Sequence, residues 1–281
     1  MDGEIMGIGT LAHTVGQLPL KQLTEKLSGR GVDFVQLALS KAIRDIDTSI
    51  GKLSPALANH IGEQFHRAGI RIGVLGCYIN PIHPDPQQRR LEINRFKEHL
   101  RFARDFGTSI VATETAELTT YLAHDAERYE DIGWTTLKQT VEELAEEAER
   151  WGVFIGLEPV ATHTLSSSAK MARILEEVPS SNLGVVFDPV NLLPVTAIES
   201  QEAFLDQAFA AFGDRIVLAH LKDVNVQSDK LEAVRSGQGI FQTKSFLDKL
   251  HQAKPGVDIS LEMVSDDNLD TTIQYVRGLL G

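Results

Sequence analysis

The chain has 281 residues, a formal net charge of −12 and 42% apolar residues. This length allows one large α/β domain or two small ones, and the acidic balance argues against a nucleic-acid-binding surface, which needs clustered Lys and Arg. A single cysteine, Cys77, excludes an intrachain disulfide and a zinc site built from several thiolates. The start of the chain is acidic and lacks an apolar leader, and no apolar run reaches the about 18 residues of a membrane span. We therefore expect a cytoplasmic protein with no membrane or nucleic-acid partner.

Short apolar runs alternate with longer amphipathic segments along the whole chain. We predict eight strands, at residues 5–10, 33–39, 70–79, 108–114, 153–158, 183–188, 215–220 and 258–263. Apolar residues at helical spacing fill the segments between them, and several of these segments begin at Ser, Thr or Asp and end near Gly. The stretch 116–133 is predicted to be a long loop, the kind of segment that often forms a lid.

Eight strand–helix units in a chain of this length predict a (β/α)₈ TIM barrel, forming a single domain over residues 1–281. Near-continuous apolar strands are typical of a parallel sheet that is covered on both faces. The alternative is a doubly wound open sheet, which usually has a glycine-rich phosphate turn after its first strand. The corresponding segment here, GIGTLAHTVG (7–16), contains no G-x-G-x-x-G pattern.

Metal-competent side chains end four consecutive predicted strands, the fifth to the eighth. They are Glu158, Asp188, His220 and Glu262. In a closed barrel the carboxyl ends of neighbouring strands converge on one rim, where active sites form. One acidic residue at a strand end is commonly a helix cap, but three carboxylates on one rim without a cation would repel one another. The set of four therefore predicts a site for one divalent metal ion.

Three carboxylates and one imidazole make an oxygen-rich ligand set. Such a set favours Mn²⁺, with Mg²⁺, Co²⁺ or Zn²⁺ as alternatives, and leaves positions open for substrate oxygens. Further polar residues on the predicted rim are candidate substrate contacts, although each also fits a plain role in a loop or cap. They are His13, Glu114, His163 and Lys222.

These strand ends and their neighbours resemble the xylose isomerase-like superfamily, and within it the sugar phosphate isomerase/epimerase group. The matching pieces are GLEP (156–159), FDPVN (187–191), HLKDV (220–224), SGQGI (236–240) and LEM (261–263). The four metal-competent residues are 30, 32 and 42 positions apart, which looks like the pattern of ketose 3-epimerases. The first half of the chain matches more weakly, through YINPIHPDPQQRR (78–90).

The resemblance implies a divalent-metal-dependent sugar isomerase or epimerase. Glu158, Asp188, His220 and Glu262 would hold the metal, and Glu158 and Glu262 would also act as an acid/base pair on opposite faces of a sugar. One carboxylate would remove a proton next to a carbonyl, giving a metal-stabilised enediolate, and the other would return a proton. The resemblance also implies a small sugar or polyol as substrate and a homo-oligomer, either a dimer or a tetramer.

Two positions depart from the ketose 3-epimerase pattern. Asn191 stands where those enzymes have a histidine, and Val226 stands where they have an arginine. An asparagine amide still hydrogen-bonds a sugar hydroxyl, so Asn191 is predicted as a substrate contact and the sugar stays open. The segment SGQGI (236–240) fits either a tight turn or a backbone site for a phosphate.

Other functions of the same barrel lead to different expectations. An inosose-type dehydratase or lyase would use the same metal site and then expel a hydroxyl group. A non-catalytic carbohydrate-binding barrel would need no paired bases. The abasic-site endonuclease of this superfamily has additional histidines at positions that are Asn191 and Leu231 in this chain, so DNA repair is disfavoured.

Overall fold

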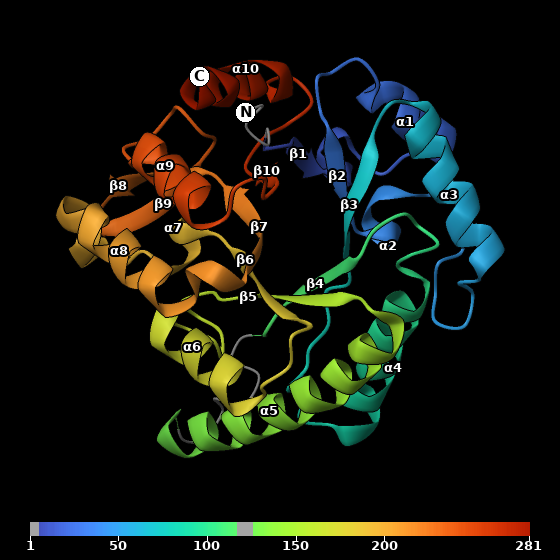
Figure 1. Ribbon diagram of the computed structural model, residues 1–281, viewed down its shortest axis with the longest axis horizontal. Helices are drawn as coiled ribbons and strands as arrows, with labels where there is room; N and C mark the ends of the chain where they lie inside the picture. The colour runs from blue at the N-terminus through green and yellow to red at the C-terminus, as the bar shows by residue number, and fades with distance from the viewer. Residues whose placement is uncertain (1–5, 117–125) are drawn as a thin grey trace.

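The predicted strands form a closed parallel barrel in the computed structural model. The structure describes residues 6–116 and 126–281, with the side chains of residues 126–129 left out. The order around the barrel is β1-β10-β7-β6-β5-β4-β3-β2. First and last strands pair side by side and close it (Figure 1). The barrel strands are β1 (Ile8–Leu11), β2 (Phe34–Leu37), β3 (Arg71–Gly76), β4 (Ile110–Glu114), β5 (Phe154–Glu158), β6 (Leu183–Phe187), β7 (Ile216–Leu221) and β10 (Ile259–Leu261). The (β/α)₈ prediction is confirmed.

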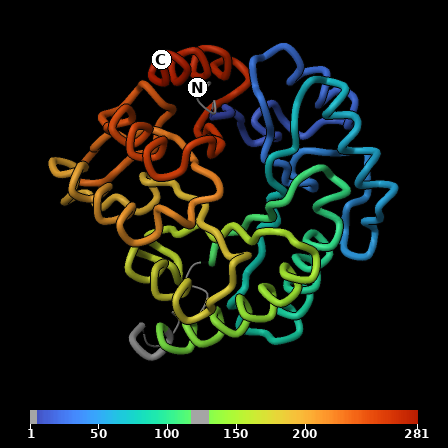
Figure 2. Tube along the Cα trace, viewed as in Figure 1, coloured from blue at the N-terminus to red at the C-terminus, as the bar shows by residue number. Residues whose placement is uncertain are grey.

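Helices surround the barrel, and the chain follows one circuit so that its first and last segments meet (Figure 2). The helices are α1 (Leu20–Leu27), α2 (Leu39–Ala42), α3 (Pro55–Arg67), α4 (Pro86–Phe102), α5 (Ala126–Trp151), α6 (Ser168–Glu177), α7 (Pro189–Leu192), α8 (Gln201–Phe212), α9 (Thr243–Ala253) and α10 (Leu269–Leu280). Short 3₁₀ turns lie at η1 (Ala12–Val15), η3 (Val195–Ser200) and η4 (Gly213–Arg215).

An apolar cluster fills the inside of the barrel. Its buried members are Phe34, Val74, Ala112, Val186 and Leu218. Because side chains of a strand alternate between its two faces, the residue two positions later faces the same interior, one layer nearer the carboxyl rim. That later residue is polar in four of these strands, where it is Gln36, Glu114, Asp188 or His220. The strand period therefore places a polar layer directly over an apolar one.

Two segments differ from the predictions. Residues 223–227 (β8) and 230–234 (β9) form an antiparallel hairpin outside the barrel, where the sequence pattern predicted no strand. The prediction of a loop over residues 116–133 is wrong in its last part, because α5 already begins at Ala126. Residues 117–125 of the predicted loop lie outside the described part of the chain. The helix contains Gly133, and a glycine is tolerated inside a helix at a modest cost.

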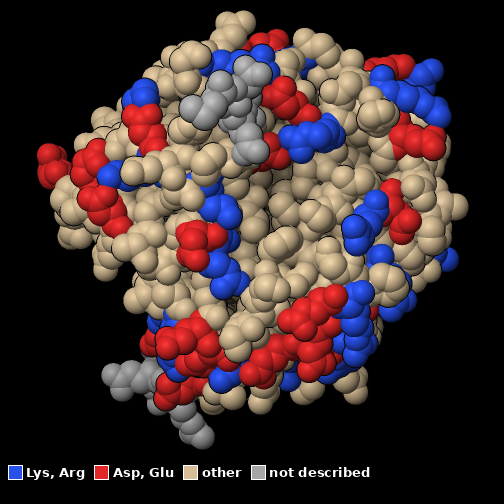
Figure 3. All heavy atoms as spheres, in the orientation of Figure 1, with Lys and Arg blue, Asp and Glu red and all other residues tan. Residues whose placement is uncertain are grey.

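The surface carries charges of both signs. On the face shown in Figure 3, Lys and Arg lie among Asp and Glu and form no continuous basic surface. None of the described helices is long and apolar enough to cross a membrane. The mixed charges on the face in Figure 3 agree with the formal net charge of −12.

Phe34 fits inside the barrel because its neighbours on the adjoining strands are glycines. A Cβ atom at Gly73 would lie 2.5 Å from Phe34 Cδ2, and one at Gly9 would lie 2.4 Å from the Phe34 backbone oxygen. We expect Gly73→Ala to lower the free energy of unfolding by about 1–3 kcal/mol, the usual cost of overpacking a core. In a Phe34→Ala background most of that loss should disappear, because the atoms that Gly73→Ala would meet, Cδ2, Cγ and Cε2 of Phe34, are then absent.

Gly9→Ala is the matched control for this prediction. Its closest clash, at 2.4 Å, is with the Phe34 backbone oxygen, which Phe34→Ala keeps. Phe34→Ala should therefore relieve the cost of Gly9→Ala only in part, through the two ring atoms at 2.7 Å. Urea denaturation of the single and double variants measures both costs. The same cost for Gly73→Ala in both backgrounds would show that the ring is not what requires the glycine.

Candidate metal centre

Four predicted residues converge at the carboxyl ends of β5, β6, β7 and β10. Each offers one ligand atom, and these atoms all lie within 4.8 Å of one another; the residues are Glu158, Asp188, His220 and Glu262. The first three are buried, and the Glu262 side chain is 18% exposed. The strands are neighbours in the barrel, so the sequence order of the strand ends becomes a single cluster in space.

Asp188 has its two carboxylate oxygens in different roles. It caps the short helix α7, where Oδ1 accepts hydrogen bonds from the backbone N–H groups of Val190 (2.9 Å) and Asn191 (3.2 Å). Pro189 follows as the first helical residue, a position that suits its fixed φ angle. The cap fixes the side chain and leaves Oδ2 facing the cluster. Asp188 is therefore both a cap and a candidate ligand.

The ammonium group of Lys222 lies inside this cluster. Its Nζ is 2.9 Å from Asp188 Oδ2, 2.9 Å from Glu262 Oε2 and 2.7 Å from Asn191 Oδ1. The Asn191 amide in turn donates from Nδ2 to Glu158 Oε1 over 2.8 Å. The two predicted substrate contacts therefore touch the candidate metal ligands themselves.

The charged groups of the cluster shift one another's pKa values. Burial raises the pKa of Asp188 to about 6, although the Lys222 ammonium acts in the opposite direction. For His220, burial acts to lower the pKa, but the Glu158 and Glu262 carboxylates outweigh it and hold the pKa well above its usual range. Burial acts to raise the pKa of Glu262, but His220 and Lys222 outweigh it and lower the pKa. The carboxylates thus depend on these two cationic partners.

The arrangement fits a divalent metal ion. Asp188 Oδ2 and His220 Nδ1 are buried atoms with ionic contacts but no well-directed hydrogen bond. His220 Nδ1 lies 3.3 Å from Glu158 Oε1 and 3.2 Å from Glu262 Oε1, so two carboxylates face one ring nitrogen. A carboxylate oxygen of Asp188 completes a group of ligand atoms that lie within 4.8 Å of one another. Carboxylate oxygens with a single imidazole suit Mn²⁺, Mg²⁺, Co²⁺ or Zn²⁺. These four side chains would hold such an ion.

Three more predicted residues lie around the same rim. Glu114 ends β4 in register with Glu158, and burial followed by the Glu158 charge raises its pKa. His163 Nε2 is 3.7 Å from Glu114 Oε2. His13 follows β1 in the turn η1; burial and the charge of Lys41 lower its pKa. Their roles as substrate contacts stay predictions.

The SGQGI segment forms a tight turn around Asp223. Asp223 Oδ1 accepts from the backbone N–H groups of Val224 and Phe241, each at 2.8 Å, and Oδ2 accepts from that of Gly237 at 3.0 Å. A Cβ atom at Gly239 would lie 2.4 Å from Asp223 Oδ1, so this position needs glycine. The turn thus uses the Gly237 N–H group to hold Asp223, in agreement with the tight-turn alternative for this segment.

Gln36 and Tyr78 are polar residues beside the cluster that the sequence reading missed. Gln36, in the middle of β2, is 1% exposed and its Oε1 lies 2.8 Å from His220 Nε2. Its Nε2 donates to the Tyr78 hydroxyl over 2.9 Å. The available signal was one polar residue, Gln36, within the otherwise apolar run 34–39.

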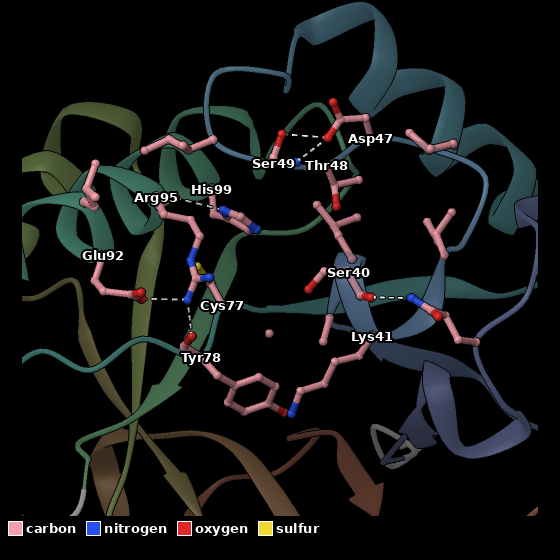
Figure 4. Close-up of a pocket in the computed structure, with 18 of the residues that line it drawn as sticks. Ser40, Lys41, Asp47, Thr48, Ser49, Cys77, Tyr78, Glu92, Arg95 and His99 are labelled. Atoms are coloured by element: carbon pink, nitrogen blue, oxygen red, sulfur yellow. Dashed lines mark hydrogen bonds and ion pairs between the residues drawn. The ribbon is translucent and has the colours of Figure 1, made fainter. Parts of the chain in front are cut away.

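A cavity of about 670 Å³ opens beside Tyr78, over the ends of β2 and β3. Lys41 and Tyr78 face each other on one side of it, with Lys41 Nζ 4.2 Å from the centre of the Tyr78 ring (Figure 4). Arg95 and Cys77 line it further along, where burial raises the pKa of the Cys77 thiol to about 12. The wall of this cavity is thus linked to the metal cluster through Tyr78 and Gln36.

The fold and the cluster together define a TIM barrel with a candidate metal centre on its carboxyl rim. The model of the xylose isomerase-like TIM barrel family matches residues 25–279, and the chain belongs to that family. No curated protein sequence matches the chain. The family assignment confirms the resemblance read from the strand ends.

Solved structures share the fold at low sequence identity. A D-tagatose 3-epimerase-like protein is 19% identical with a TM-score of 0.77, covering 98% of this chain and 97% of that one. An IOLI protein with a bound zinc atom is 18% identical with a TM-score of 0.73, covering 97% and 96%. D-psicose 3-epimerase from Clostridium cellulolyticum H10, with D-tagatose, is 16% identical with a TM-score of 0.70, covering 98% and 99%.

The contacts of Lys222 lead to a prediction about metal-free and metal-loaded protein. Lys222→Met removes the ammonium that offsets Asp188 and Glu262, and breaking a buried ion pair in this way costs about 3–5 kcal/mol. We expect this loss of unfolding free energy in EDTA, and a much smaller loss with saturating Mn²⁺, because the added cation then offsets the carboxylates. Chemical denaturation under both conditions measures the difference.

Lys249→Met is the matched control, because Lys249 also contacts two carboxylates, those of Glu202 and Asp206, but on the surface. Exposed ion pairs contribute about 0–1 kcal/mol, so this variant should change stability little and equally with and without Mn²⁺. A Lys222→Met defect that Mn²⁺ leaves unchanged would contradict the charge-balance explanation.

Proposed function

We propose that the chain is a divalent-metal-dependent sugar isomerase or epimerase that moves a proton at a carbon next to a carbonyl. One observation carries the proposal. Glu158 on β5 and Glu262 after β10 come from strands separated by β6 and β7, yet both reach the same imidazole, at 3.3 Å and 3.2 Å from His220 Nδ1. Two carboxylates that approach one centre from different sides fit a reaction with two bases.

The chemistry assigns a role to each group. A divalent metal ion held by Glu158, Asp188, His220 and Glu262, most simply Mn²⁺, would supply a Lewis acid for the carbonyl and a neighbouring hydroxyl oxygen. One of the two glutamates would remove the proton from the adjacent carbon, and the other would deliver a proton to the opposite face. Delivery to the opposite face inverts the carbon, which is epimerisation; transfer along a single face exchanges aldose and ketose.

The surrounding residues suit a polyhydroxylated substrate. Lys222 and Asn191 already lie beside the ligands and would contact substrate oxygens. Glu114, His163 and His13 surround the same rim and would bind hydroxyl groups further out. The epimerase names of two structural neighbours support the same substrate class, a small sugar or polyol. A homo-oligomer and a cytoplasmic location remain predictions.

Deuterium incorporation tests the proposal. Mn²⁺-loaded protein is incubated in D₂O with a panel of ketoses, aldoses and inososes, and the sugars are followed by NMR. We expect deuterium at a carbon next to the carbonyl, with the product stereochemistry distinguishing epimerisation from isomerisation. Glu158→Gln and Glu262→Gln should each reduce this exchange by about 10²–10⁴-fold, the usual contribution of a general acid or base.

Glu143→Gln is the control, because Glu143 pairs with Arg90 and Lys97 on the surface and lies outside the cluster. It should exchange deuterium at the wild-type rate. An eliminated product that has lost a hydroxyl group would replace the proposal with a dehydratase. Saturable sugar binding without exchange by any member of the panel would instead indicate a binding protein.

A further inference from the structure

The Gln36 side chain contacts His220 across the interior of the barrel. Its Oε1 lies 2.8 Å from His220 Nε2, while the other ring nitrogen, Nδ1, faces Glu158 and Glu262. In the order of strands, β1 and β10 separate β2 from β7, so the contact crosses the barrel interior. Gln36 is 1% exposed and His220 is fully buried, so this contact is shielded from solvent.

The strand period explains why Gln36 can reach His220. Phe34 and Leu218 meet in the apolar layer of the barrel, and Gln36 and His220 follow each of them by two positions. Residues two apart face the same side of a strand, so the second pair meets one layer closer to the rim. The contact therefore rests on the same packing that holds Phe34.

The far end of the Gln36 amide is also held. Its Nε2 donates to the Tyr78 hydroxyl over 2.9 Å, so both polar atoms of the amide are occupied. The Tyr78 ring is fixed in turn beside Lys41, whose Nζ lies 4.2 Å from the ring centre (Figure 4). With both ends occupied, the amide oxygen has a defined position opposite the imidazole.

We propose that Gln36 is a positioning residue that makes Nδ1 the metal-ligating atom of His220, an inference that rests on the proposed metal site. A carbonyl oxygen only accepts hydrogen bonds, so the nitrogen opposite it, Nε2, carries the hydrogen. A neutral imidazole has one hydrogen, and the lone pair is then on Nδ1, which faces the carboxylates. Such outer partners orient ligating histidines and fix their tautomer.

The choice of an amide over a carboxylate has a consequence for charge. A carboxylate at this place would add a fourth negative charge to a group that already holds Glu158, Asp188 and Glu262. An amide fixes the ring in the same way without that charge. Gln36 thus orients His220 and leaves the balance between carboxylates and cations unchanged.

The Mn²⁺ affinity of the full-length protein tests the positioning role of Gln36 separately from any enzymatic activity. Calorimetric titration with Mn²⁺ should give about 10- to 100-fold weaker binding for Gln36→Met, the usual cost of losing an outer partner of a metal ligand. Gln36→Glu keeps an acceptor opposite Nε2 and should bind Mn²⁺ at least as tightly as wild type. Loss of Mn²⁺ affinity in both variants would overturn the proposal, since it would show that a hydrogen-bond acceptor opposite His220 Nε2 does not determine the affinity.

Gln201→Met is the matched control. Gln201 is 3% exposed and donates from Nε2 to the backbone oxygens of Ile198 and Ile240, outside the metal cluster. It should lower stability against urea but leave Mn²⁺ affinity at the wild-type value. Equal weakening of Mn²⁺ binding in Gln201→Met and Gln36→Met would reveal a general effect of core polarity, and would also overturn the proposal.

The tautomer itself is observable by NMR. In Zn²⁺-loaded protein labelled with ¹⁵N-histidine, His220 should show its hydrogen on Nε2 and the metal on Nδ1; His220→Gln assigns the signal. A hydrogen on Nδ1 would overturn the proposal, even where Gln36→Met does not fold. If the wild-type protein binds no divalent metal, the proposed function fails together with this inference. If the wild-type protein binds Mn²⁺ and Gln36→Met binds it equally tightly, only the inference about Gln36 fails.

Discussion

The constraint on which this site depends is the mutual repulsion of three carboxylates in a largely buried place. Glu158, Asp188 and Glu262 lie within 4.8 Å of one another through their ligand atoms, at a depth where charge is costly unless it is paired. The described residues pair them with Lys222 and His220. A divalent cation together with Lys222 would match the three negative charges and leave His220 neutral, the form in which an imidazole ligates a metal.

The barrel imposes where these groups meet. Parallel strands bring their carboxyl ends to one rim, and in four of them the two-residue period sets a polar residue above an apolar one. Leu218 is followed in this way by His220, and Val186 by Asp188. The apolar layer excludes water from beneath the site, which strengthens every charge interaction in it. The core that stabilises the barrel and the electrostatics of the site therefore depend on the same strand register.

The sequence predicted the parts of the site that follow from strand ends. Glu158, Asp188, His220 and Glu262 each end a recognisable apolar run, and a closed barrel brings such ends together. Gln36 was not predicted, because its partner is 184 residues away and a lone polar residue in a strand has several explanations. The β8–β9 hairpin and the early start of α5 were missed for a related reason: short strands and an internal glycine give weak local signals.

Under the proposed function, Lys222 would connect the charge balance of the site to substrate binding. Its ammonium contacts Asp188 Oδ2 and Glu262 Oε2, so a bound cation would compete with it for these two carboxylates. Lysine carries a compact charge on a flexible stem, and it can move from these oxygens to a nearby anionic group with little rearrangement. An arginine would hold the carboxylates in a rigid fork and resist that movement. The residue that offsets the carboxylates in the metal-free chain is thereby the one that a cation would release beside the substrate.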